Sequence, residues 1–143
     1  MASLLKISIG VLLFLCGVQD MRSKKISLWL VLSGAILISL IVINSTTLSI
    51  INCLGGLGVG IFVIIISILT EGKIGMGDGL LLCVTGIGLG FWTNLELFAL
   101  ALLLAAIVSI LLLTFRVADR KKCIPFIPFL FFSFLGQLII PIL

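Results

Sequence analysis

The sequence contains no histidine and no tyrosine, and only 10% of its 143 residues are charged. Without histidine the chain cannot assemble a Ser-His or Cys-His nucleophile, nor a histidine-containing zinc site. The four cysteines are Cys16, Cys53, Cys83 and Cys123, and none belongs to a C-x-x-C pair. We interpret them as small buried hydrophobic residues. The sequence therefore predicts no metal site and no cofactor.

Charged and polar residues are too few to cover a soluble core. Hydrophobic residues make up 62% of the chain, and the mean hydropathy is +1.52. The apolar runs are continuous and do not alternate with period two, which argues against a membrane barrel. We predict an all-α, polytopic membrane protein whose residues 1–143 form one domain in contact with membrane lipid. The net charge of +4 comes from short clusters between apolar runs, so it does not indicate nucleic-acid binding.

Six apolar runs approach the roughly 20 residues that cross a bilayer. They are approximately Ala2–Gln19, Ile26–Ile43, Leu48–Thr70, Gly79–Trp92, Leu95–Phe115 and Ile124–Leu143. The first run could be a secretory signal peptide. It lacks a small-residue cleavage site and is followed directly by Asp20, so we interpret it as a retained span.

The basic residues predict the orientation of these spans. Eight of the nine lie in the first, third and fifth breaks: Arg22, Lys24, Lys25, Lys73, Arg116, Arg120, Lys121 and Lys122. The positive-inside rule places these breaks in the cytoplasm and both termini outside the cell membrane. The short run Gly79–Trp92 could instead be re-entrant, but the basic cluster 116–122 would then lie outside. We therefore predict a short crossing that is packed closely by its glycines.

Two of the five acidic residues stand out by position. Asp119 lies in a basic loop, Glu96 near a helix start, and Glu71 at the end of a span, which are ordinary solvated or dipole-favoured places. Asp20 ends the first span and Asp78 opens the fourth, so both are expected at the cytoplasmic boundary. Ionisable residues at membrane depth are candidates for function, and each of these two is the best partner for the other.

A pair of carboxylates is suited to peptide hydrolysis. Two neighbouring acids share a proton, because both cannot ionise cheaply. The ionised acid takes a proton from the attacking water, and the protonated acid donates to the carbonyl oxygen. From composition and topology alone, the alternative that both aspartates are polar caps at helix ends stays open.

Glycines surround the second aspartate at Gly75, Gly77 and Gly79. Glycine permits left-handed or strained backbone and allows another chain to come close. Irregular backbone at membrane depth is tolerated where it lines an enclosed cavity. The pattern therefore predicts a mobile catalytic loop that an extended peptide can reach.

Three segments together resemble a known family. GMGD, Gly75 to Asp78, resembles the signature of the GxGD membrane aspartyl proteases, and within them of the type IV prepilin peptidases. DMRSKKIS, Asp20 to Ser27, is similar to that family's first-aspartate segment. IPFIPFL, Ile124 to Leu130, is similar to its late Ile-Pro-Phe-Gly-Pro-Phe-Leu motif.

The resemblance implies a role for particular residues. It implies that Asp20 and Asp78 are catalytic, and that Pro125 and Pro128 support the site from the late motif. Prolines at this position could also simply begin a helix. Three positions depart from the family pattern: Ser27 replaces a proline, Leu80 a lysine and Ile127 a glycine.

The resemblance also implies the substrate. The chain is similar to the short, peptidase-only members that lack the methyltransferase insert, and their substrates are pilin, pseudopilin or Flp-type precursors with a short basic leader. Three alternatives stay open: an inactive relative acting as an assembly partner, a small proton- or cation-coupled transporter, and another GxGD protease that acts on membrane stubs. Proteases of that last kind usually place their first aspartate after a tyrosine, which this chain lacks.

Overall fold

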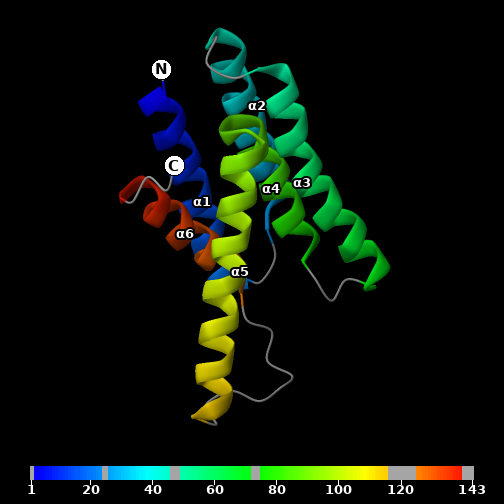
Figure 1. The fold of residues 1–143 in the computed structure, drawn as a ribbon, viewed down its shortest axis with the longest axis vertical. Helices are drawn as coiled ribbons and strands as arrows, with labels where there is room; N and C mark the ends of the chain where they lie inside the picture. The colour runs from blue at the N-terminus through cyan, green and yellow to red at the C-terminus, as the bar shows by residue number, and fades with distance from the viewer. Residues whose placement is uncertain (1, 24–25, 46–48, 72–74, 116–124, 140–143) are drawn as a thin grey trace.

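The described residues of the computed structural model, which are 2–23, 26–45, 49–71, 75–115 and 125–139, form six α-helices (Figure 1). The helices are α1 Ala2–Ser23, α2 Leu28–Asn44, α3 Ile50–Leu69, α4 Met76–Leu89, α5 Phe91–Thr114 and α6 Ile127–Ile139. The predicted all-α class is confirmed for these residues. Several residues used in the sequence predictions lie outside the described ones: Lys24, Lys25, Lys73, Arg116, Asp119, Arg120, Lys121, Lys122 and Cys123.

Three of the helices are long and apolar enough to cross a membrane by length and composition. These are α1, α3 and α5, with hydropathy between 1.7 and 2.9. The other three are shorter, with 17 residues in α2, 14 in α4 and 13 in the described part of α6. The structure therefore supports a helical membrane protein with three long spans, and six full crossings stay a prediction.

The chain turns between α4 and α5 earlier than the sequence predicted. The predicted runs Gly79–Trp92 and Leu95–Phe115 left the break at Thr93 and Asn94, but these residues lie inside α5. The turn is made at Gly90, whose φ of 83° lies in a region that glycine enters without a steric penalty. The predicted boundary was wrong because the backbone conformation of one glycine, and not side-chain polarity, ends α4.

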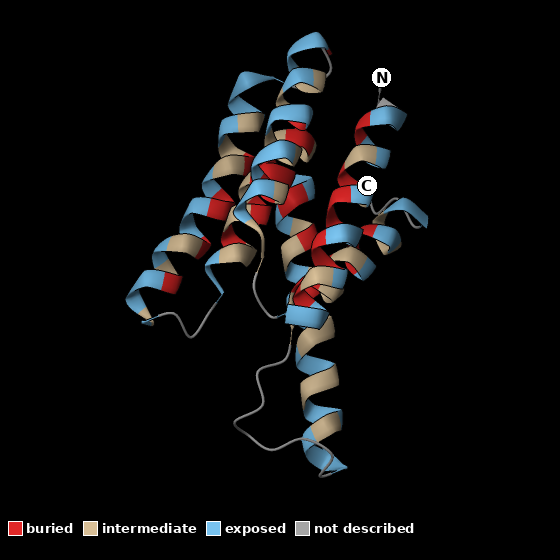
Figure 2. Ribbon diagram, turned by 180° about the vertical axis from the view of Figure 1, so that it is seen from behind, coloured by how far each residue is buried: buried red, intermediate tan, exposed pale blue. Residues whose placement is uncertain are grey.

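Helices α3 and α4 approach each other through glycines. A methyl group added at Gly56 would meet the backbone carbonyl of Gly86, and one added at Gly60 would meet the backbone of Cys83. Both contacts would be closer than 3.0 Å, which real Cβ atoms essentially never show. The predicted close packing of the Gly79–Trp92 run is therefore present in the structure. Figure 2 shows the buried residues of these helices as bands on their inward faces.

A buried polar cluster joins the same two helices to α5. The Asn94 side chain is fully buried; its Nδ2 donates to the carbonyl oxygens of Gly56 at 3.1 Å and Leu82 at 3.0 Å. The Thr85 hydroxyl donates to Asn94 Oδ1 at 2.7 Å. One amide therefore connects α3, α4 and α5 at the end of α4 farthest from Asp78. Nothing in the sequence pattern had singled out Asn94.

Replacing Asn94 by alanine should lower the free energy of unfolding by about 2 kcal/mol. The substitution leaves a hole and removes three hydrogen bonds in a place without water to replace them. Thermal unfolding in detergent, followed by circular dichroism, measures the change. Asn44→Ala is the matched control, because that exposed side chain bonds only within its own helix. Equal effects of the two substitutions would contradict the structural role of Asn94.

The apolar core lies where all six helices meet, with Val63 as the contribution of α3. It includes Leu13, Leu81, Leu97 and Phe134, all of which are at most 2% exposed. Among the described residues, none of α5 beyond Ala101 belongs to this core or packs against it. Figure 1 shows this half of α5 extending past the other helices. Because that half is almost entirely apolar, it requires a lipid environment or a partner surface.

Candidate active site

Asp20 lies inside α1, three residues before the helix ends, and is 9% exposed. The predicted span ended at Gln19, but the helix continues to Ser23 and carries the aspartate with it. Asp20 Oδ2 accepts a hydrogen bond of 3.4 Å from the backbone N–H of Ile127 at the start of α6. The N-terminus of a helix favours a negative charge, so α6 directs its positive end at this carboxylate.

The late proline motif lies against α1 next to this contact. Pro128 is the second residue of α6, and its Cα is 3.8 Å from the position of a Cβ on Gly17. Pro125 lies two residues before the helix and is half-buried. The prolines therefore stand at a helix start, as the simpler interpretation expected. That helix start also packs beside Asp20, so the two interpretations of the motif are compatible.

Asp78 lies in the first turn of α4 and is half-buried. Its backbone N–H donates to the Gly75 carbonyl at 3.1 Å. The carboxylate folds back over Gly75, where an added Cβ would be 2.9 Å from Asp78 Oδ2. A side chain at position 75 would therefore displace the carboxylate.

The three glycines around Asp78 do not use the left-handed backbone that the sequence suggested. Gly75 has a φ of −63°, and Gly90 is the one glycine among the described residues with a positive φ. Gly77 and Gly79 instead lie directly against side chains of Ile26 and Ile64. Of the two uses of glycine considered from the sequence, the close approach of another segment is the one observed at Gly77 and Gly79.

The two aspartates come from different helices and lie near each other. The charge of Asp20 is close enough to act on the Asp78 carboxylate by electrostatic repulsion. Both stand at the ends of α1 and α4 that face the same side of the bundle (Figure 1). Like charges at short range favour a state in which the pair holds one proton. The arrangement can therefore supply one general base and one general acid.

A bond between backbone and side chain ties the segment after α1 back to this site. The Ser27 N–H donates to Gln19 Oε1 at 3.3 Å, and Gln19 is the neighbour of Asp20. Ile26, just before Ser27, covers Gly77. Sequence reasoning missed Gln19 and Ile26. Gln19 contacts Ser27, and Ile26 contacts Gly77, so each contact joins two separate segments. Neither glutamine nor isoleucine is a residue type from which such a contact could be predicted.

Replacing Ser27 by proline should change the free energy of unfolding by less than about 1 kcal/mol. Ser27 has φ −70° and ψ 115°, within the range of proline, and Ile26 before it is not helical. The loss of the bond to Gln19 is offset by a less flexible unfolded chain. Thermal unfolding of Ser27→Pro and of Gln19→Ala/Ser27→Pro should then give similar midpoints. A large further loss on adding Gln19→Ala would contradict this account.

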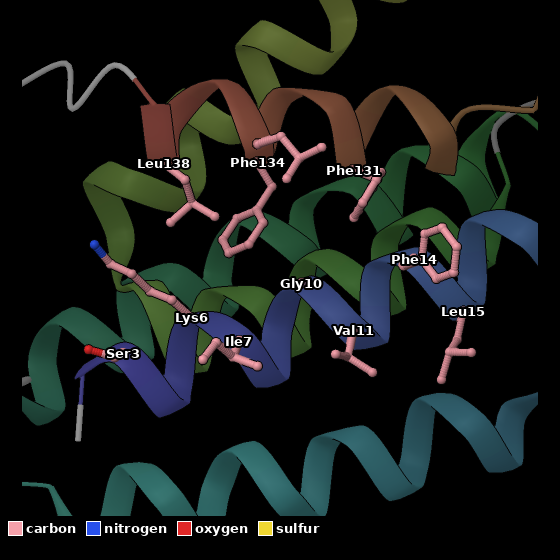
Figure 3. A pocket seen from close by; sticks show the side chains of 11 residues that line it. Ser3, Lys6, Ile7, Gly10, Val11, Phe14, Leu15, Phe131, Phe134 and Leu138 are labelled. Carbon is pink, nitrogen blue, oxygen red and sulfur yellow. The ribbon is translucent and has the colours of Figure 1, made fainter.

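A groove of about 530 Å³ runs between α1 and α6, and its lining side chains are shown in Figure 3. Phe14 and Phe131 lie at one end, with ring centroids 5.5 Å apart, and Lys6 lies near Leu138 at the other. The lining contains neither Asp20 nor Asp78 and is apolar apart from Ser3 and Lys6. It supplies no acid–base pair, so we place the candidate chemistry at the aspartates.

Comparison with known proteins agrees with the resemblance noted in the sequence. The model of the type IV leader peptidase family matches residues 7–115. This segment contains both aspartates and ends before α6. No curated protein and no solved structure gave a significant match. Because the family match covers most of the sequence, the chain belongs to the type IV leader peptidase family.

Proposed function

We propose that the chain is a membrane aspartyl endopeptidase that removes the short basic leader from prepilin-like precursors, with Asp20 and Asp78 as its catalytic pair. The observation that carries the proposal is that these two carboxylates stand at the ends of α1 and α4 on the same side of the bundle, where the charge of Asp20 acts on Asp78. Membership of the type IV leader peptidase family supports the same activity. No other acid pair of this kind occurs among the described residues.

The two aspartates act as a unit in the proposed reaction. One carboxylate removes a proton from the attacking water, and the other, protonated, donates to the carbonyl oxygen of the scissile peptide. The N–H of Ile127 donates to the Asp20 carboxylate, while the Gly75 carbonyl, just before α4, accepts from the backbone N–H of Asp78. When the carbon–nitrogen bond breaks, the proton acquired by the first carboxylate passes to the leaving amine. As the carbonyl group re-forms, the second carboxylate takes a proton back from the hydroxyl of the tetrahedral intermediate, so the pair returns to its singly protonated state.

Helix lengths suggest how deep the site lies. At 1.5 Å per residue, α4 is about 21 Å long and α5 about 36 Å. The two are joined at Gly90 and run in opposite directions (Figure 1), so α5 extends about 15 Å past the start of α4. The far half of α5 is apolar and belongs in lipid. We therefore propose that Asp78 is recessed below the cytoplasmic surface of the membrane, and not level with it.

The proposed topology follows from charge and depth together. We propose six crossings with both termini outside, in which α4 and α6 cross as short helices near a recessed site. The precursor's basic leader would remain in the cytoplasm, while its apolar helix would enter the membrane. Its scissile peptide would have to be extended to reach between the aspartates, because a helix hides its backbone carbonyls in hydrogen bonds.

The three departures from the family pattern leave the aspartates in place. Ser27 stands at the N-cap position of α2 without a side-chain cap hydrogen bond, and Leu80 packs against the apolar core. Ile127 contributes to the site through its backbone N–H, which any residue other than proline would supply. None of these observations favours an inactive relative or a transporter over the peptidase.

A cleavage assay tests the proposed function. The chain is expressed in membranes together with precursors that carry a short basic leader before an apolar helix. Loss of the leader is followed by gel shift, and the new N-terminus is sequenced. We expect one cut at the junction of leader and helix. A folded, inserted protein that cuts none of these precursors would contradict the proposal.

A further inference from the structure

We propose that Ile26 is a positioning residue whose side chain, seated on Gly77, sets the spacing between the two aspartates. This inference rests on the proposed function, because it concerns the same site. It assigns a role to a hydrophobic residue that neither carries chemistry nor belongs to the GMGD segment.

The contact between the two residues is tight. A Cβ added to Gly77 would meet Ile26 Cδ1 far inside 3.0 Å, would be 3.1 Å from Cγ1, and would be 3.4 Å from the Ile26 Cβ. Ile26 is itself half-buried and packs against the apolar core. The isoleucine thus occupies the volume in which any side chain at position 77 would stand.

The backbone of Gly77 does not require glycine. Gly77 lies in the first turn of α4 and does not have a positive φ. Alanine is favoured over glycine in such a helix by about 1 kcal/mol. What prevents a larger residue at position 77 is therefore the Ile26 side chain. The absence of a side chain at Gly77 leaves the space that Ile26 fills.

This contact bridges helices that otherwise meet only slightly. The main partner of α4 is α3, and its direct contact with α1 is small. Ile26 contacts α4 beside Asp78, while the next residue, Ser27, is hydrogen-bonded to Gln19 beside Asp20. A short chain of contacts therefore runs from one aspartate to the other through Ile26. Helix α2, which follows Ile26, packs on both α1 and α4, so Ile26 stands where these helices come together beside the two aspartates.

The test is a size exchange between the two positions. Gly77→Ala should lower kcat for leader cleavage by about 10- to 100-fold and change KM by less than about 2-fold, because small displacements of catalytic groups cost rate. Adding Ile26→Val removes only Cδ1, and adding Ile26→Ala also removes Cγ1. We expect cleavage to recover in this order, as the nearest remaining atom retreats from Cδ1 to 3.1 Å and then 3.4 Å.

A neighbouring pair provides the matched control. Ile64 of α3 packs on Gly79, two residues after Gly77, and its Cγ1 would be 2.6 Å from a Cβ added there. Ile64→Val deletes the same methyl group, but it should not restore Gly77→Ala. Equal recovery with Ile64→Val and Ile26→Val, or wild-type cleavage by Gly77→Ala, would overturn the inference. If Gly77→Ala does not fold, the single variant Ile26→Ala should still lower kcat with KM unchanged. Full activity of that folded variant would also overturn it.

A distance measurement separates this inference from the proposed function. Met21 and Met76 are 66% and 55% exposed and adjoin the α1 and α4 ends of the site. Spin labels on Met21→Cys and Met76→Cys, in a background without other cysteines, report the spacing without any cleavage. We expect the distance to shift or broaden in Gly77→Ala and to return with Ile26→Val. An unchanged distance in Gly77→Ala would overturn the role of Ile26. A changed distance in a protein that cleaves nothing would overturn only the proposed function.

Discussion

Asp20→Asn and Asp78→Asn should each lower the rate of leader cleavage by at least about 10³-fold while the protein stays folded. Asparagine has the shape of aspartate, and its carbonyl oxygen still accepts the bond from the Ile127 N–H. It neither accepts a proton from water nor donates one as a carboxylic acid does. General acid–base catalysis contributes about 10²- to 10⁴-fold, and both roles depend on the pair.

The double variant sharpens this prediction. Groups that act as one unit are strongly non-additive, so Asp20→Asn/Asp78→Asn should be no slower than the slower single variant by more than a few-fold. Glu96→Gln is the matched control, because it neutralises an acid on α5 away from the site, and it should keep cleavage within about 2-fold. Multiplied losses in the double variant, or cleavage surviving either single change, would contradict the two-aspartate mechanism.

Gly56→Ala should lower the free energy of unfolding by about 3 kcal/mol or more. The new methyl group would meet the carbonyl oxygen and carbon of Gly86, which are backbone atoms that cannot rotate away. The two helices would have to separate, and the bond from Asn94 to the Gly56 carbonyl would be lost with them. Overpacking of this kind costs about 1–3 kcal/mol, and the broken buried bond adds to it.

The control for this change lies two residues along the same helix. Gly58 is exposed, and no atom lies within 4 Å of an added Cβ. Gly58→Ala should therefore leave stability unchanged or raise it by up to about 1 kcal/mol, since alanine favours the helix. Thermal unfolding of both variants in the same detergent decides the matter. Similar midpoints for the two variants would show that α3 and α4 do not pack through Gly56 and Gly86.

Some residues of the candidate site could be predicted from the amino-acid sequence. Asp20 and Asp78 were identifiable because a carboxylate beside a long apolar run is costly and therefore conspicuous. The glycines around Asp78 were equally visible, but their role was only half anticipated. Whether a glycine serves a left-handed turn or a close contact depends on what lies opposite, and at Gly77 that is Ile26.

The sequence predicted neither the boundary between α4 and α5 nor the burial of Asn94. Polar residues between apolar runs predict a break, yet the segment 93–96 lies within α5, and Asn94 joins three helices. A buried amide that finds all its partners has the same sequence signature as a loop residue. Only the arrangement of α3, α4 and α5 shows which of the two it is.

Three conclusions follow from the amino-acid sequence without coordinates: the helical membrane class, the two acids that are candidates for the chemistry, and the family. These conclusions follow from local properties: apolar run length, the cost of a charge in lipid, and short motifs. The tertiary structure decided the contacts between segments far apart in the chain: α6 directed at Asp20, Ile26 seated on Gly77, and the glycine contacts of α3 with α4. Such contacts depend on distances between helices, and hydrophobic pattern specifies only which face of a helix is buried.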